Sequence, residues 1–408
     1  MSALTCEPAT KAEVATPSLK RALDRFKPVV LKNGHYRLLA DKIMLALTPG
    51  RLDLWSAGDL GCDLRMEIPL AGKVDDGRIV VSFRQLLKLV TIIREPFLRL
   101  GIDDGRLLVV PGDRPLGMPL PAACEGDDYP APPEVSQSRE TLVLPGKLFA
   151  EALSRVAPLS AGNSSSGDYA LTRILLEDEP AGGVNLTASD GARLGIAHVA
   201  GGQGTAGGGK GFFGFTPREA KMIARLAEEE ESVRIACLDC DKDGRTDAVF
   251  GRNWRVRIKH EICQWPDWRF VMPDLNACGQ ALEMETAPLL SALAEMRPLL
   301  EGNESNGLMI HPAGQAAEGQ ATIGGYMPCR DDDKPGRRDL YRVSLPAGRN
   351  TLAVAIRFDV NQFESIVKAA GKSFVMRLSS DDAGTCYKSP AHFTSGSFQA
   401  LLMPLVIA

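Results

Sequence analysis

LTASDGARLGI, the stretch from Leu186 to Ile196, is a strong β-hairpin signal. The residues up to Ser189 and those from Arg193 onward favour β-strand, and Asp190-Gly191 between them predicts a tight turn, because glycine adopts positive φ at little cost. By itself the stretch indicates a hairpin tip and nothing more. Similar turn signals recur about a third of the chain away, which indicates internal repeats.

Amphipathic helices recur at the same interval. The apolar residues Leu19, Leu23 and Phe26 fall on one helical face, as the period of an α-helix requires. Comparable patterns predict six helices in total, over residues 18–30, 83–95, 145–157, 217–229, 288–300 and 360–372. Short, alternating β-rich runs separate them, and few helices among many hairpin-linked strands predict an α+β fold with antiparallel sheets.

The repeats predict three similar domains with two helices each. Closing sequences rich in proline and aromatic residues, YPAPPE at 129–134 and WPDWRFVMP at 265–273, mark the ends of the first two. The expected division is a polar N-terminal tail over 1–17, followed by domains over 18–139, 140–273 and 274–408.

The bulk composition is that of a globular protein with several domains. The chain has 408 residues, 44% of them hydrophobic, and a formal net charge of −4. No apolar run reaches the ~18 residues of a membrane span, the N-terminus lacks the apolar core of a secretory signal, and the nine scattered cysteines suit reduced thiols. We therefore expect a cytoplasmic protein without a membrane partner.

Charge is segregated along the chain. Cationic side chains outnumber acidic ones on most of the expected helices, whereas the net charge is negative. Arg84 and Lys88, and likewise Arg218, Lys221 and Arg225, fall on one solvent-facing stripe of their helices. A solvated helix face explains any single stripe, but the pattern as a whole favours a positive surface made of helices.

Motifs for catalysis or metal binding are incomplete. GTAGGGKG at 204–211 has Gly211 where a phosphate-binding loop needs Ser or Thr. DCDKDGRTD at 239–247 is similar to a calcium loop, but Phe250 stands at its twelfth position instead of glutamate. Cys237 and Cys240 form a lone C-x-x-C pair, and no nucleophile elbow is present. We expect no cofactor, no metal and no catalytic residues.

Several motifs, in order along the chain, are similar to those of one family. AGDLGCDLRMEI at 57–68 and LPAACEGDDYP at 120–130 resemble a strand and the closure of its first domain. TASDGARLGIA resembles the T-D-G-x-R-L hairpin of its middle domain, Trp265-Pro266-Asp267-Trp268 its F-P-D-Y, and Met403-Pro404-Leu405 its terminal M-P-x. The family is the bacterial DNA sliding clamp, the β subunit of DNA polymerase III, and the likeness covers about residues 18–408.

This resemblance implies a head-to-tail homodimer, closed into a ring around duplex DNA, with helices lining the hole. It implies a nucleoid-associated, non-catalytic processivity factor of the DNA polymerase holoenzyme. Its DNA-facing residues would be Lys20, Arg25, Arg84, Lys88, Lys147, Arg218, Lys221, Arg225 and Lys368, and its dimer contacts would include Leu116 on one subunit and Leu299 and Leu300 on the other.

The resemblance also implies a hydrophobic groove between the second and third domains. In the family, short linear motifs of the polymerase and the clamp loader bind there. Carried over position by position, the groove comprises Leu171, Ser189, Gly191, Arg193, Leu194, Pro266, Val271, Leu401, Met403, Pro404 and Leu405. A purely structural role in core and hairpin is the alternative for these residues.

The chain departs from the family pattern at the groove. Ala192 stands where histidine is common, Phe270 where arginine is common, and the tail reads MPLVIA in place of M-P-x-R-L. These departures predict a more apolar groove with a different preferred peptide. Two other functions stay open: a clamp-fold paralogue that acts only as a partner-binding module, and a β-rich hydrolase.

Overall fold

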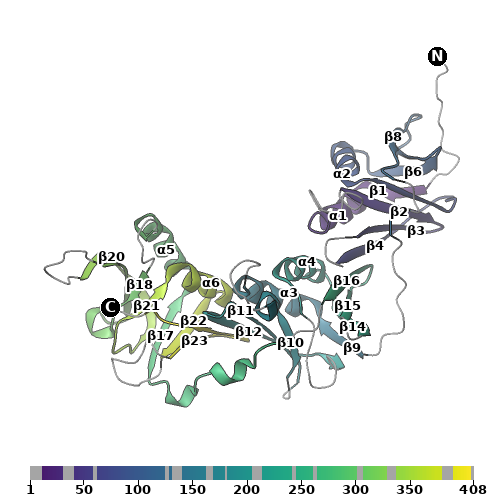
Figure 1. Cartoon of the computed structure of the whole chain (residues 1–408). Coiled ribbons are helices and arrows are strands. Elements are labelled where there is room, and N and C mark those ends of the chain that lie inside the picture. The colour runs from purple at the N-terminus through teal and green to yellow at the C-terminus, as the bar shows by residue number, and fades with distance from the viewer. Residues whose placement is uncertain are drawn as a thin grey trace. The chain divides into compact units, whose positions relative to one another are not determined.

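The structure is a computed structural model of the chain. It describes residues 12–30, 41–57, 62–124, 128–130, 140–161, 169–179, 182–204, 214–240, 245–260, 264–300, 307–328, 337–378 and 389–405. Figure 1 shows the helices and strands of the chain. The chain divides into two compact units. Unit 1 contains residues 1–150, 203–207 and 222–262, and unit 2 contains residues 151–202, 208–221 and 263–408.

Six α-helices occur in the described residues, one in each region where the sequence predicts a helix. Their bounds are α1 Thr16–Phe26, α2 Phe83–Ile92, α3 Gly146–Val156, α4 Pro217–Ala227, α5 Thr286–Leu300 and α6 Val360–Ala370. Side-chain caps fix two of the N-termini: Ser82 accepts from the Gln85 N–H at 3.2 Å, and Asp359 accepts from the Asn361 and Gln362 N–H groups. In unit 1, α1 packs against α2, and in unit 2, α5 packs against α6.

Unit 1 contains two antiparallel sheets. The four-stranded sheet has the order β1 (Ala12–Ala15), β6 (Phe97–Asp103), β7 (Arg106–Pro111) and β8 (Met118–Pro121). The nine-stranded sheet has the order β13 (Gln203–Gly204), β9 (Glu140–Pro145), β14 (Ser232–Cys240), β15 (Arg245–Phe250), β16 (Trp254–His260), β4 (Asp63–Pro69), β3 (Arg51–Ala57), β2 (Lys42–Thr48) and β5 (Gly77–Ser82).

Unit 2 contains one antiparallel sheet of eleven strands. Its order is β10 (Leu175–Asp178), β11 (Val184–Ser189), β12 (Arg193–Val199), β24 (Phe398–Leu402), β23 (Ala391–Ser395), β22 (Ser373–Leu378), β17 (Gln280–Glu285), β20 (Arg337–Asn350), β19 (Gln320–Pro328), β18 (Gly307–Ile310) and β21 (Ile356–Asp359). Because every strand pair described is antiparallel, the predicted α+β class with antiparallel sheets is confirmed.

Aromatic packing anchors α6 on the sheet of unit 2. The ring of Phe363 on α6 lies 5.4 Å from that of Phe358, 5.9 Å from that of Phe393 and 6.5 Å from that of Phe374, measured between centroids. Such rings bury large apolar areas. This core holds the strands beside β24 in place, and β24 carries part of the candidate site.

The N-terminal tail is shorter than the sequence predicts. Residues 12–15 form β1, which pairs with β6, and α1 begins at Thr16. Ala12 and Val14 are buried while Glu13 and Ala15 are not, which is the alternation of an edge strand with one covered face. The predicted polar tail over 1–17 is therefore wrong for residues 12–17.

One element order occurs three times along the described residues. From β1, from β9 and from β17, the order is a strand, a helix, four strands, a second helix and three strands. Hydrogen-bonded strand pairs join successive repeats, β16 to β4 in unit 1 and β12 to β24 in unit 2. The boundaries of the three domains at 139 and 273 stay a prediction.

An ion pair strengthens the β16–β4 junction. Arg257 Nε lies 2.6 Å from Asp63 Oδ2, and the Asp63 side chain is almost fully buried. Burial raises the pKa of Asp63, and the positive charge of Arg257 opposes that increase.

Candidate functional site

The turn between β11 and β12 is a compact, hydrogen-bonded tip. Asp190 Oδ1 accepts from the backbone N–H groups of Ala192 and Arg193, each at 3.0 Å. Ser189 Oγ donates to the Arg193 carbonyl at 2.8 Å and accepts from the Gly191 N–H at 3.1 Å. Gly191 has φ of +91°, which other residues rarely adopt. The hairpin predicted from LTASDGARLGI is confirmed.

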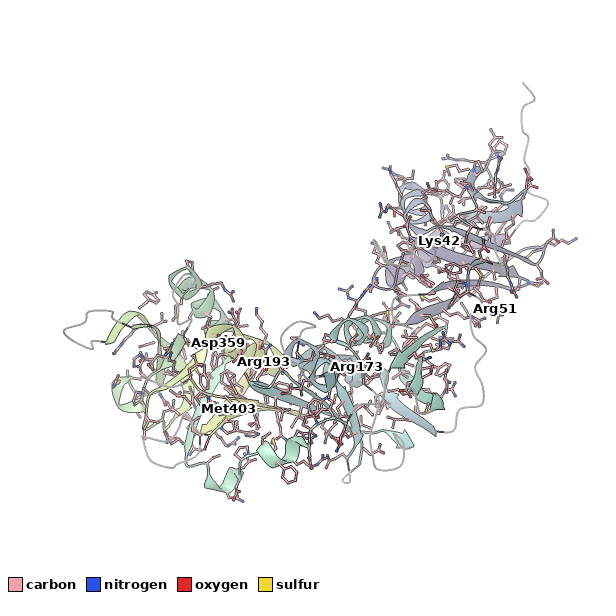
Figure 2. All side chains as sticks on the ribbon, viewed as in Figure 1. Lys42, Arg51, Arg173, Arg193, Asp359 and Met403 are labelled. Atoms are coloured by element: carbon pink, nitrogen blue, oxygen red, sulfur yellow. The ribbon has the colours of Figure 1, made fainter. Side chains whose placement is uncertain are left out.

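Arg193 attaches this tip to the rest of unit 2 (Figure 2). Its Nε lies 2.9 Å from Asp190 Oδ2, and its guanidinium donates to the Pro158 carbonyl at 3.2 Å and to the hydroxyl of Ser365 on α6. The side chain is largely buried. Its charge is therefore satisfied within the protein, and its position is fixed.

The C-terminal segment extends the sheet beyond β24. The Met403 N–H donates to the Ala192 carbonyl at 3.1 Å, which adds one more bond beside the hairpin tip. Two residues later, the Leu405 N–H donates to the Arg357 carbonyl of β21 at 2.7 Å. Pro404 is buried and Leu405 half-buried. The segment is thus anchored on both sides of Pro404, unlike a frayed chain end.

Leu194 of β12 and Leu401 of β24 form a cross-strand pair at the centre of the site. Together with Ile196 they are buried, and three side chains of the connector before β17 cover them. We call this group the apolar cluster: Leu194, Ile196, Leu401, Trp265, Trp268 and Met272.

Polar bonds hold the connector against β10 and the segment before it. The Trp265 indole N–H donates to the Arg173 carbonyl at 3.1 Å, and the Trp268 indole N–H donates to Glu177 at 2.7 Å. Arg269 lies over the Trp268 ring at 4.4 Å, within the range of a cation–π contact. Buried tryptophans need such partners for their N–H groups, so the connector has a defined path.

Apolar side chains remain exposed around this anchored connector. Phe270 is 87% exposed and Val271 55%, and Met403 is 40% exposed on the neighbouring tail. Pro266 is also exposed. Large exposed apolar groups gathered near one another are typical of interaction surfaces.

The structure describes all eleven residues that the sequence assigns to a groove, and it brings most of them to this place. Leu194 and Leu401 lie within the apolar cluster, Met403 beside Ala192, and Pro266 and Val271 on the connector. The carbonyls of Leu171 and Ser189 both accept from the Ala161 N–H at 3.0 Å. Sequence reasoning missed Ile196, Trp265, Trp268 and Met272. A signal was present, because two tryptophans three residues apart, placed before a strand, indicate a segment that covers apolar side chains.

Basic side chains cover the exposed faces of several helices. On α4, Glu219 turns back to accept from the Thr216 N–H at 2.8 Å, which leaves Arg218, Lys221 and Arg225 on the exposed side. Lys20, Arg84, Lys88, Lys147 and Lys368 are exposed as well. These positions include eight of the nine predicted DNA-facing residues.

Ion pairs involve three of these cations. Arg25, the ninth residue, is half-buried and lies 2.6 Å from Glu229, Lys368 lies 2.7 Å from Glu364, and Arg84 lies 4.0 Å from Asp41. In the described part of the chain, no carboxylate lies within 4 Å of the charged groups of Lys20, Lys88, Lys147, Lys221 or Arg225. These five side chains face solvent and have no ion-pair partner among the described residues.

Other sequence-derived sites lie largely outside the described residues. Most of the glycine-rich loop at 204–211 and the central part of the acidic hairpin at 239–247 are among them. No group of three or more potential metal ligands occurs in the described ranges. None of the described helices is long and apolar enough to cross a membrane.

Neither a protein-family model nor a curated protein matches the sequence. Solved structures do match the whole chain. The sliding clamp of Pseudomonas aeruginosa has a TM-score of 0.78 at 17% identity, over 98% of this chain and 100% of that chain. DNA polymerase III β subunits from Thermotoga maritima (TM-score 0.76, 16% identity, 98% and 100% coverage) and Streptococcus pyogenes (0.78, 13%, 97% and 100%) are similar. The chain has the sliding-clamp fold.

Two residues of the site, Ala192 and Phe270, differ from the family pattern. Ala192 places only a methyl group at the hairpin tip, and its carbonyl accepts from Met403. Phe270 points an aromatic ring into solvent, while the neighbouring Arg269 folds back onto Trp268 and Glu177. That these differences make the groove more apolar stays a prediction.

The predicted dimer contacts of the clamp fold are only partly described. Leu116 is exposed in the segment between β7 and β8. Leu299 and Leu300 end α5, and their side chains lie outside the described residues. Their role as dimer contacts stays a prediction.

Proposed function

We propose that this protein is a non-catalytic processivity factor that encircles duplex DNA as a head-to-tail homodimer and tethers a DNA polymerase. The observation that carries the proposal is the fold match over 98% of this chain and all of the Pseudomonas aeruginosa clamp. At 17% identity it supports the fold directly and the function by analogy.

The basic helix faces support the DNA part of the proposal. Five helix cations in the described residues have no carboxylate within ion-pair distance, although the whole chain has a net charge of −4. Exposed lysine and arginine attract phosphates without reading bases. A surface of this kind suits a protein that must slide along any sequence.

The apolar cluster and its exposed rim support the partner part. A peptide that covers Met403, Val271 and Phe270 would bury on the order of 300 Å² of apolar area, which corresponds to about 7–8 kcal/mol of favourable free energy. The entropy lost when the peptide binds and becomes ordered offsets part of this free energy. The expected dissociation constant is then near the micromolar range. We therefore propose that short linear motifs of the polymerase and the clamp loader bind here.

Closure into a ring requires a second copy. Head-to-tail contacts that close leave no free interface, and the exposed Leu116 is a candidate contact. Light scattering after size exclusion tests this step, because the ring requires twice the 43.9 kDa of one chain.

The decisive experiment measures DNA synthesis on primed circular DNA with the cognate polymerase and clamp loader. Long products that depend on this protein support the proposal. A dimer that binds partner peptides but never lengthens the products supports the alternative of a clamp-fold binding module. A monomer that does neither contradicts both.

A further inference from the structure

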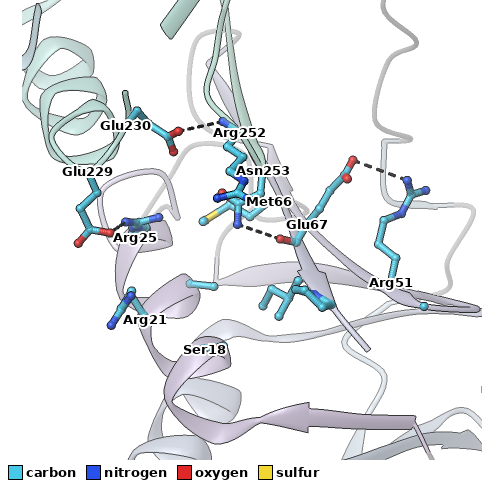
Figure 3. Close-up of a pocket in the computed structure, with 14 residues that line it drawn as sticks. Ser18, Arg21, Arg25, Arg51, Met66, Glu67, Glu229, Glu230, Arg252 and Asn253 are labelled. Carbon is cyan, nitrogen blue, oxygen red and sulfur yellow. Dashed lines mark hydrogen bonds and ion pairs between the residues drawn. The ribbon is translucent and has the colours of Figure 1, made fainter. Parts of the chain in front are cut away.

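Unit 1 contains a hollow of about 570 Å³ (Figure 3). Of its lining residues, Arg25 is among the predicted DNA-facing positions, and Arg21 and Arg252 are not. Five segments line the hollow: α1, the turn before β3, the end of β4, the loop that follows α4 and the loop that follows β15. Arginines predominate among its charged residues, which are Arg21, Arg25, Arg51, Glu67, Glu229, Glu230 and Arg252.

All three carboxylates of the hollow already have partners. Glu229 lies 2.6 Å from Arg25. Glu230 accepts from the Trp254 indole N–H at 2.8 Å and from the backbone N–H of Arg252 at 3.1 Å.

Glu67, the third carboxylate, lies 3.8 Å from Arg51 and 3.6 Å from Arg65. The acidic groups are thus paired with neighbouring arginines or N–H donors, as Figure 3 shows for Glu229 and Glu230.

Two arginines of the hollow, Arg21 and Arg252, are left after these pairs are assigned. Within the described residues, no carboxylate lies within 4 Å of the side chain of Arg21 or of Arg252. Arg21 precedes Arg25 by one helical turn, so both lie on the same face of α1. Like charges brought together in this way repel one another, and a bound anion would remove that repulsion.

The geometry points to a binding site for an oligophosphate group in this hollow, held chiefly by Arg21 and Arg252. Guanidinium groups bind phosphate oxygens through paired N–H donors and do so better than lysine. The volume lies in the range of small-molecule sites and exceeds the size of one phosphate. The phosphate chain comes either from a free nucleotide or polyphosphate, or from a strand of nucleic acid.

Thermal unfolding and calorimetric titration of the full chain with sodium tripolyphosphate test the site. A ligand that binds the folded state raises the melting temperature, and the increase grows with the logarithm of its concentration above the dissociation constant. We expect saturable binding that weakens as salt rises, because the arginines are exposed. Arg21→Ala and Arg252→Ala should each weaken binding by about tenfold, since each removes a charge-assisted contact.

Matched variants separate the site from general attraction to basic surface. Lys73→Ala removes an exposed charge of unit 1 that neither lines the hollow nor belongs to the predicted DNA-facing residues, so it should leave the affinity unchanged. Arg21→Lys keeps the charge but loses the paired donors, and its affinity should lie between those of wild type and Arg21→Ala. Since all three positions are exposed, the variants should fold as the wild type does.

The source of the phosphate is determined by comparing ATP with a short single-stranded oligonucleotide. Tighter binding of ATP, lost in Arg21→Ala, identifies a nucleotide site. Tighter binding of the oligonucleotide, lost in the same variant, identifies a site for a nucleic-acid strand. Absence of saturable binding by tripolyphosphate and oligonucleotide alike overturns the inference. Binding that survives the joint Arg21→Ala and Arg252→Ala substitution, or that Lys73→Ala weakens equally, also overturns it. None of these measurements requires ring formation or DNA synthesis.

Discussion

Replacing Met403 tests whether the exposed rim of the apolar cluster binds partners, because this side chain is partly exposed and is not a member of the cluster itself. Its backbone N–H makes the bond to Ala192, and alanine keeps that bond. Leu401, two residues earlier, is buried, so its replacement would destabilise the sheet itself. Met403→Ala therefore changes the binding surface with little effect on folding.

The magnitude follows from the exposed part of the side chain. Burying a whole methionine side chain contributes about 1.5–3 kcal/mol, and Met403 has 40% of its surface left for a ligand to cover. The loss is then roughly 0.6–1.2 kcal/mol, or a dissociation constant about three- to eightfold higher. Met403→Asp should weaken binding about a hundredfold or more, because a peptide would also have to desolvate a charge.

Fluorescence anisotropy with a labelled peptide of the Q-L-x-L-F type measures this effect. Ile92→Ala is the matched control, because Ile92 is an exposed apolar residue on α2 in unit 1. Its affinity should equal that of the wild type. Undiminished binding by folded Met403→Asp protein would place the partner site elsewhere and refute the reasoning.

Three further predictions concern DNA, assembly and pH. The Arg218→Glu, Lys221→Glu double variant should load less well onto circular DNA, and its loading should depend less on salt. The control variant Lys259→Glu on β16 should load as the wild type does. Equal loading of the double variant and the wild type at all salt concentrations would contradict a DNA-facing α4. Leu116→Asp should give folded monomer in light scattering, since a charge would enter the proposed interface; an unchanged dimer would remove Leu116 from that interface. Burial lowers the pKa of His392 below its usual 6.5, so the unfolded chain takes up the proton first as pH falls. The free energy of unfolding should therefore decrease below about pH 6.5, and urea titrations of His392→Gln should lack this decrease.

Local signals in the sequence determined the elements and their repetition. The period of Leu19, Leu23 and Phe26 predicts α1, and these three side chains are buried. Asp190-Gly191 predicts its turn because only local backbone geometry and Asp190's own hydrogen bonds decide it. A short strand such as β1 escaped prediction because four residues show too little alternation before they have a partner strand.

Only the tertiary structure decided which of these elements meet. Leu194 and Leu401 are far apart in the sequence, and the pairing of β12 with β24 places them side by side. The tryptophans of the connector cover them because Arg173 and Glu177 of another segment accept their N–H groups. The same holds for the hollow, which Arg21 and Arg252 line together because of the packing of unit 1. Such long-range contacts depend on burial and on partners that no local pattern encodes, whereas helix period and turn chemistry are fixed within a few residues of the chain.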